Sequence, residues 1–335
     1  MRTAPPTAST AFTVFAALAV CTAPAEAQVR RPVHTYSIVA MDTGTGQLGV
    51  AVQSHWFSVG SVVTWAEPAV GAVATQSFAE PAYGPRGLYL MRTGLTAPDA
   101  LTALLRADAD SQVRQAAMID AEGRVAAHTG SRNIPAAGHH VGRHYSVQAN
   151  LMRNDRVWPA MARAYETTRG DLAERLLAAL DAGEAAGGDI RGKQSAALVV
   201  VSGDRSARPW ERVFELRVED HPAPLVELRR LLRVARAYAA ATDGDNFVAA
   251  GEIDSALAAY TRAATILPDS ATNGELIYWQ AVTLADLGRV DQAIPFFRRA
   301  FAQDTSWIDL LWRLPRVGLL RADSAMVARI VRQAR

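Results

Sequence analysis

The chain has 335 residues, half of which are hydrophobic, and its 35 lysines and arginines nearly balance 33 aspartates and glutamates. This length favours two domains, because a single hydrophobic core stops growing at about 250–300 residues. No basic block with interleaved aromatic side chains occurs, so we do not expect a nucleic-acid partner.

The N-terminus has the features of a secretory signal peptide. Residues 11–20, AFTVFAALAV, form an apolar run that is shorter than the ~20 residues of a membrane span. Small residues follow, and Ala25-Glu26-Ala27 matches the A-x-A cleavage pattern. We therefore predict a signal peptide over residues 1–27, cleavage after Ala27, and a mature protein in the periplasm or the medium, free of the membrane. The alternative is a retained anchor.

The single cysteine, Cys21, lies in the segment that we predict to be removed. The mature protein would then have no disulfide, no cysteine-bound zinc and no catalytic cysteine. Lipid attachment at Cys21 is the alternative, but it needs a small residue directly before the cysteine, and Val20 stands there.

Strands and helices are predicted in alternating blocks after a short linker, residues 28–34. The first block has strands over residues 35–42, 47–54, 61–66 and 69–77, and helices over 83–92 and 97–107. The second has strands over 112–120, 124–129 and 145–151, helices over 157–168 and 171–186, and strands over 194–202 and 212–219.

The predicted strands are apolar on both faces, which is typical of sheets that are covered on both sides. We therefore predict an α+β domain over residues 35–221. In this four-layer αββα sandwich, a helix pair covers the outer face of each of two packed sheets. A three-layer α+β fold is compatible with the same order of elements.

The C-terminal part, residues 222–335, is predicted to be all-α and contains an internal repeat. Gly251–Leu257 aligns with Gly288–Ile294, and Tyr260 aligns with Phe297, each pair being 37 positions apart. The spacing of small and aromatic residues resembles tetratricopeptide repeats, whose usual period is 34 residues. This predicts a helical-repeat domain that can bind a protein partner. An unrelated pair of helical hairpins is the alternative.

Polar side chains stand at the ends of several predicted strands. Alternation along the second strand places Gln53 and His55 on one face and Ser54 on the other. The fourth strand ends in Gln76 and Ser77, and a later strand carries Gln148 and Asn150. Polar groups within apolar strands must find partners, so these residues are candidates for a pocket lining. A structural role, including helix capping, is the alternative.

The loop 187–192, GGDIRG, combines three glycines with Asp189 and Arg191. Arg191 could clamp a carboxylate and Asp189 could bind an amine, or the two could form an internal pair that fixes the loop. His140 and His144 have the i, i+4 spacing of metal ligands on a helix. Their surroundings, AAGHHVGRHYS, are predicted to be a loop with no acidic residue nearby, so no metal is expected.

Four stretches carry a resemblance to a known family: TYSIVAMDTGTGQLGVAVQSHWFSVGSVV, GAVATQSFAEPAYGPRGL, HYSVQANLM and GGDIRGKQSAALVVV. They extend from residue 35 to about residue 201, and over this range the chain resembles domain of unknown function 1028. That family is grouped by fold with the N-terminal-nucleophile (Ntn) hydrolases. The resemblance therefore implies an Ntn-hydrolase-like sandwich, followed here by the tetratricopeptide-like region.

The resemblance also implies a reaction centre. An Ntn hydrolase uses the first residue of its first strand as nucleophile and the free α-amine of that residue as base. Thr35 stands at this position, so a second cut between residues 34 and 35 is required after signal cleavage. His55, where many members have lysine, would assist. An ordinary structural role for either residue is the alternative.

The predicted site has further members, all implied by the same resemblance. Gln76 and Asn150 would supply hydrogen bonds near the oxyanion, with Asn150 counted among the catalytic residues. The substrate-binding residues would be Gln53, Ser54, Gln76, Ser77, Asp189 and Arg191. The expected substrate is a small amide or peptide, and no cofactor is expected.

Two other functions remain open at this point. The sandwich could bind a small ligand without turnover while the repeats recruit a protein. Alternatively, the chain could serve assembly, since a homo-oligomer is expected for domains of this type. The N-terminal sequence of the mature protein discriminates between them, because a chain that begins at Thr35 favours catalysis and an uncut chain favours binding without turnover.

Overall fold

The computed structural model describes Met1, Val33 and residues 35–335. The predicted signal peptide and most of the linker lie outside these residues, so cleavage after Ala27 and export stay predictions. Within the described part of the chain, no helix combines the length and the apolarity needed to cross a bilayer.

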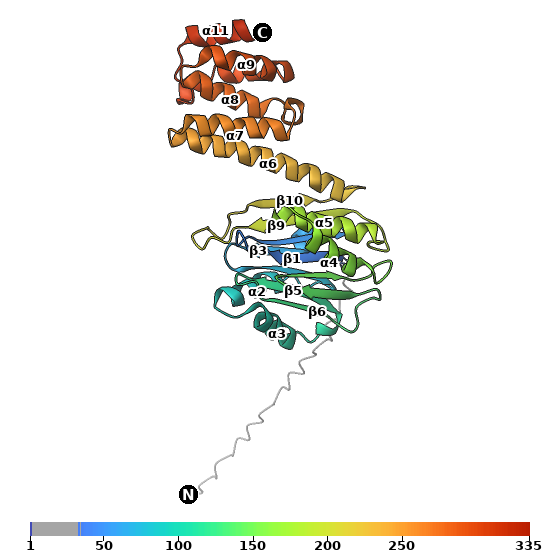
Figure 1. Cartoon of the computed structure of the whole chain (residues 1–335). Coiled ribbons are helices and arrows are strands. Elements are labelled where there is room, and N and C mark those ends of the chain that lie inside the picture. The colour runs from blue at the N-terminus through green and yellow to red at the C-terminus, as the bar shows by residue number, and fades with distance from the viewer. Residues whose placement is uncertain (2–32, 34) are drawn as a thin grey trace. The chain divides into compact units, whose positions relative to one another are not determined.

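Within the described residues, ten strands form two antiparallel sheets (Figure 1). The first sheet has the order β10-β9-β2-β1-β8-β7, with bounds Phe214–Val218, Ser195–Val201, Leu48–Ser54, Thr35–Met41, Tyr145–Ala149 and Gly138–Gly142. The second has the order β3-β4-β5-β6, with bounds Thr64–Glu67, Gly71–Ser77, Arg114–Asp120 and Val125–Thr129. The expected mixed α/β class with two antiparallel sheets is confirmed.

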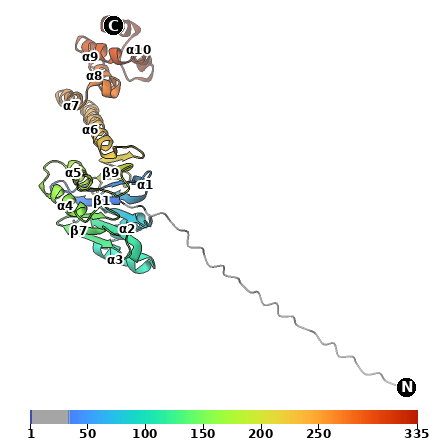
Figure 2. The same cartoon turned by 90° about the vertical axis from the view of Figure 1, so that its right-hand side faces the viewer.

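Each sheet has one face against the other sheet and one face against a helix pair. In β1, Val39 joins the core between the sheets, whereas its neighbour Ile38 joins the core beneath the helices. Helices α4 (Val157–Thr167) and α5 (Leu172–Ala185) cover the first sheet (Figure 2). Helices α2 (Tyr83–Arg92) and α3 (Ala97–Ala107) cover the second. Alternating side chains therefore enter two different cores, which explains why the strands are apolar on both faces.

The strand predicted over residues 61–66 is only partly correct. A helical turn, α1 (Gly60–Val63), precedes the short strand β3. Val59 and Val63 are four positions apart and both are fully buried in the core between the sheets. The side chains of such a short apolar run can be buried either in a strand or in one helical turn. The pattern of apolar residues therefore does not discriminate between the two.

The loop predicted around His139 and His140 is wrong, because these residues lie in the edge strand β7, paired with β8. Two glycines made the segment look like a loop. A Cβ atom at Gly138 would come within 2.6 Å of the Trp158 ring, and one at Gly142 within 2.1 Å of the Tyr145 ring. The glycines thus make room for aromatic side chains rather than for a loop conformation.

The C-terminal region is helical, as predicted. Its helices are α6 (Pro224–Ala249), α7 (Ile253–Ile266), α8 (Glu275–Asp286), α9 (Val290–Gln303), α10 (Ser306–Leu311) and α11 (Ser324–Ala334). The aligned aromatic residues Tyr260 and Phe297 are both buried, on α7 and α9. The repeats therefore place equivalent side chains in helix-packing positions, while the tetratricopeptide assignment stays a prediction.

Candidate functional site

The core between the two sheets is apolar at one end and polar at the other. At the polar end, β1 and β5 begin and β4 and β8 end, so residues from four strands meet. The buried polar residues there include Thr35, Ser37, Gln76, Gln115, Ser146, Gln148 and Asn150. Each of them has no exposed surface, and alternation directs all of them away from the helix layers.

Six of these residues form a continuous network, in which Ser146 Oγ donates to Gln148 Oε1 at 3.0 Å. We call the other five the amide cluster: Ser37, Gln76, Gln115, Gln148 and Asn150. The Gln115 side-chain oxygen accepts from Gln76 Nε2 at 2.7 Å and from Asn150 Nδ2 at 2.8 Å. Gln148 Nε2 donates to Ser37 Oγ at 2.6 Å, and this hydroxyl donates to Gln76 Oε1 at 2.6 Å. A buried polar network that is satisfied in this way is rigid.

The amide cluster holds the backbone of Thr35. The Thr35 carbonyl oxygen accepts from the Asn150 backbone N–H at 3.1 Å and from Gln76 Nε2 at 3.3 Å. The Thr35 hydroxyl, in contrast, is fully buried and has no hydrogen-bond partner among the described residues. Leaving such a group unpaired costs about 1–3 kcal/mol, and an exception of this kind calls for an explanation.

Val33, two positions before Thr35, pairs with Ser77 at the end of β4 in the second sheet. The Val33 N–H donates to the Ser77 carbonyl oxygen at 2.6 Å, and the Ser77 N–H donates to the Val33 carbonyl at 2.8 Å. Val33 is 5% exposed and packs in the core between the sheets. Ser77 has a φ of 69°, a left-handed conformation that is uncommon for residues other than glycine. Thr35 itself has no exposed surface in the full-length chain.

Gln53 belongs to a second polar group, on the helix-covered face of the first sheet. Gln53 Nε2 donates to the Glu184 carboxylate at 2.7 Å, and the Tyr36 hydroxyl donates to the same oxygen at 2.9 Å. The Lys193 ammonium lies 3.5 Å from this carboxylate. Burial and the neighbouring Glu184 raise the pKa of Tyr36 well above its usual value, so Tyr36 acts as a donor. Gln53 is thus separated from the Thr35 hydroxyl by the sheet.

Asp189 and Arg191 engage each other. The Arg191 Nε donates to Asp189 Oδ1 at 3.0 Å, and a second guanidinium nitrogen donates to Oδ2 at 2.6 Å. The same carboxylate accepts from the backbone N–H groups of Arg191 and His55. Asp189 therefore connects the glycine-rich loop to the turn after β2. Of the two interpretations of this loop, the internal ion pair is the one that the structure contains.

The remaining residues predicted for the site are His55, Ser54 and Ser77. The His55 side chain is exposed in the turn after β2. Ser54 faces the core between the sheets, opposite Thr35 in the β1–β2 register, and Ser77 Oγ is buried without a partner among the described residues. No group of three or more histidine, cysteine, aspartate or glutamate side chains in the described ranges is placed to hold a metal ion.

Sequence reasoning missed Gln115 and Ser37, although Gln115 connects most of the cluster. Its side-chain nitrogen donates to Thr129 Oγ1 at 2.9 Å and to the Ala149 carbonyl oxygen at 2.9 Å. A signal was present, because a glutamine within the apolar run of β5 must be paired in the interior.

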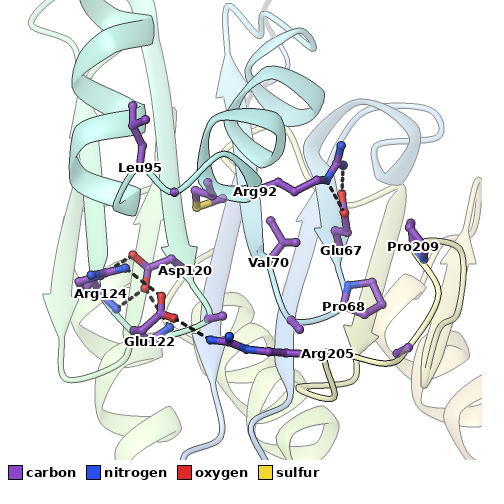
Figure 3. Close-up of a pocket in the computed structure, with 15 residues that line it drawn as sticks. Glu67, Pro68, Val70, Arg92, Leu95, Asp120, Glu122, Arg124, Arg205 and Pro209 are labelled. Carbon is purple, nitrogen blue, oxygen red and sulfur yellow. Dashed lines mark hydrogen bonds and ion pairs between the residues drawn. The ribbon is translucent and has the colours of Figure 1, made fainter.

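A cavity of about 620 Å³ lies at the opposite end of the sandwich, where β3, β5 and β9 end (Figure 3). Its charged side chains are paired: Arg92 with Glu67, Arg124 with Asp120, and Arg205 with Glu122. None of the residues singled out from the sequence lines this cavity. Its charges balance one another, so it favours no charged ligand.

Comparison with known proteins shows the family to which the chain belongs. No curated protein matches the chain. A crystal structure of a protein from Silicibacter pomeroyi, described as a DUF1028 member, is similar to it with a TM-score of 0.55 and 31% sequence identity. That match covers 60% of this chain and 89% of the other. The profile of the family of unknown function DUF1028 matches residues 35–228, more than half of the sequence. The chain therefore belongs to the DUF1028 family.

Proposed function

We propose that this protein cuts its own chain before Thr35 and then acts as an Ntn-type hydrolase on a small amide or peptide. The observation that carries the proposal is the buried Thr35 hydroxyl, which heads the first strand and has no partner among the described residues. An unpaired buried hydroxyl calls for a physical explanation, and a catalytic role is one such explanation.

The chemistry needs only the chain itself and water. The Thr35 hydroxyl oxygen attacks the carbonyl carbon of residue 34, an ester forms, and the peptide C–N bond breaks. The hydroxyl proton passes to the departing nitrogen, which becomes the free amine of Thr35. Water then hydrolyses the ester, which gives a free carboxylate on residue 34 and restores the hydroxyl. The new α-amine can accept the hydroxyl proton when Thr35 attacks a substrate amide.

The amide cluster supports this proposal by positioning rather than by direct chemistry. Gln76 and Asn150 both donate to the Thr35 carbonyl oxygen, which fixes the backbone of the nucleophile. A cut before Thr35 would leave Val33 held by its pairing with Ser77 rather than by the chain. We therefore assign Gln76 and Asn150 as positioning residues for Thr35.

The test is the intact mass and N-terminal sequence of protein from the exported fraction, for the wild type and for Thr35→Val and Thr35→Ser. We expect the wild type and Thr35→Ser to begin at residue 35. Thr35→Val should remain uncut, beginning at residue 28, and be at least as stable as the uncut wild type, since it removes an unpaired buried hydroxyl. A wild-type chain that stays uncut during storage would exclude this mechanism.

An uncut wild type would support the second candidate, a module that binds a small ligand without turnover. The pairing of Val33 with Ser77 and the complete burial of Thr35 favour it. In either case, the exported location, a homo-oligomer and a protein partner of the helical repeats remain proposals.

A further inference from the structure

The segment that the proposed cut releases has its penultimate residue, Val33, fixed at the end of strand β4. Strand β5 pairs with Ser77 on one side, whereas β3 pairs with β4 only from Gly71 to Ala74. Val33 takes the edge that β3 leaves open and exchanges both backbone hydrogen bonds with Ser77, at 2.6 and 2.8 Å. In this geometry an extended peptide adds a strand to the edge of a sheet.

The side chain of Val33 lies in a closed apolar seat. Val33 belongs to the core between the sheets, whose other buried members are valines, alanines, Leu48 and Ile119. A charged side chain in this seat would lose its hydration without gaining a partner, and a larger apolar side chain would overpack the core. The seat of Val33 therefore accepts a small apolar side chain.

The backbone contacts set a second requirement for the residue in this seat. Its N–H donates to the Ser77 carbonyl oxygen, so proline, which has no N–H, cannot take the position. The Ser77 N–H donates to the Val33 carbonyl oxygen and would lose this partner if the segment left. Departure of Val33 would also leave a cavity in the core. Both losses favour a segment that stays bound after the cut.

The seat also has a fixed relation to the reacting atoms of the proposed function. In the self-cut, the Thr35 hydroxyl oxygen attacks the carbonyl carbon of residue 34, which directly follows Val33. A substrate must bring its own scissile carbonyl carbon to the same hydroxyl oxygen. The substrate residue before the attacked one then reaches the place that Val33 occupies in the full-length chain.

We propose that the seat of Val33 is a peptide-binding subsite, which takes an extended peptide with a small apolar residue, other than proline, at its penultimate position. Its first ligand is the segment that the cut releases, which stays bound as a product. The substrate class is then a peptide rather than a simple amide, and this part rests on the proposed function. Binding of the released segment needs only a chain that begins at Thr35.

The test is isothermal titration of the chain that begins at Thr35 with a synthetic peptide of residues 28–34. This chain is the product of the proposed cut. If the wild type stays uncut, the same chain is made with the initiator methionine directly before Thr35, and it contains every helix and strand of the described residues. We expect the peptide to bind and to raise the midpoint of thermal unfolding. A chain that folds only when the peptide is added supports the proposal equally.

Variants of the peptide test the seat itself. Val33→Ala should weaken binding about tenfold, because most of the buried side chain is lost. Val33→Asp and Val33→Pro should weaken it at least about a hundredfold, because the first buries a charge and the second removes the N–H. Val29→Asp makes the same change of charge at the other valine of the segment and should change binding less than about threefold.

The outcomes separate the subsite from the proposed function. No binding, or equal binding of the Val33→Asp peptide, would overturn the subsite even if the wild type is cut. An uncut wild type together with binding that depends on Val33 would support the subsite and exclude the self-cutting hydrolase. For a cut wild type, the same peptide as its coumarin amide tests the substrate class. Val33→Asp should then lower kcat/KM at least about tenfold, and an unchanged kcat/KM would overturn the assignment to substrates.

Discussion

At the scale of single residues, the two oxygen atoms of Thr35 have different surroundings. Its carbonyl oxygen is held by Asn150 and Gln76, while its hydroxyl is buried and unpaired among the described residues. The amide cluster around it is closed, with oxygen and nitrogen atoms matched along the chain of hydrogen bonds. Two members of the amide cluster, Gln76 and Asn150, therefore fix the backbone of Thr35.

An ion pair at the same end of the second sheet predicts a pH-dependent stability. The Asp108 carboxylate accepts from the Arg114 guanidinium at 2.7 Å, from the Asp110 N–H at 2.8 Å and from the Tyr83 hydroxyl at 3.1 Å. Burial alone would raise the pKa of Asp108, but these hydrogen bonds outweigh it and lower the pKa below its usual value. The stabilisation is therefore complete above the unfolded pKa of about 3.9 and is lost as the pH falls through the lower folded pKa.

We expect Asp108→Asn to lower the free energy of unfolding by about 1–3 kcal/mol at pH 7, because it leaves the buried Arg114 guanidinium without its carboxylate. Denaturant unfolding of the variant and the wild type at pH 7 and at pH 3 measures the effect. The difference should narrow at pH 3, because the Asp108 carboxyl of the unfolded chain is then largely protonated, which favours unfolding of the wild type. A difference that is the same at both pH values would contradict this assignment.

At the scale of elements, close approach between helix α2 and strand β3 depends on one glycine. A Cβ atom at Gly84 would come within 2.2 Å of the Trp65 ring, and this ring is held in place because its N–H donates to the Val62 carbonyl oxygen at 3.0 Å. The helix therefore lies directly on the indole.

Gly84→Ala tests this contact. Alanine is intrinsically favoured over glycine in a helix by about 1 kcal/mol. We nevertheless expect a net loss of about 1–3 kcal/mol in stability, because the methyl group overpacks against Trp65. Arg86→Ala, an exposed position on the same helix, should change stability by less than about 0.5 kcal/mol. Thermal unfolding of both variants is the measurement, and a stabilised Gly84→Ala would show that the indole can move away.

At the scale of the whole molecule, helix α6 belongs to both parts of the chain. Its first half packs on β9 and β10, with Leu225, Leu228 and Leu232 in the core of the first sheet. Its second half packs on α7. On the same helix, Arg229 pairs with Glu174 of α5 at 2.6 Å. The sandwich thus uses a helix of the C-terminal region to complete its own core.

This sharing predicts that a change in α6 destabilises the sandwich. Leu228 has no exposed surface, so Leu228→Ala should cost about 2–5 kcal/mol. Val226 is 71% exposed on the same helix, and Val226→Ala should lie within about 0.5 kcal/mol of the wild type. Denaturant unfolding of the full chain measures both. Unchanged stability of Leu228→Ala would show that the sandwich folds independently of α6.

Much of this architecture followed from local patterns. The period of apolar residues placed most strands and helices, and the 37-residue repeat marked the helical region, since both signals depend on neighbours in sequence. Alternation also placed Gln53 and Ser54 on opposite faces of β2.

The candidate site itself depended on the tertiary structure. Gln76, Gln115 and Asn150 come from three strands, and only the packing of the two sheets brings them to the Thr35 carbonyl oxygen or to one another. The turn α1 and the edge strand β7 were likewise decided by contacts across the fold. The sequence by itself therefore determined which segments are apolar and how they repeat. Only the packing of the sheets decided which polar side chains share the interior, because a buried donor or acceptor is satisfied by whichever group the fold brings within reach.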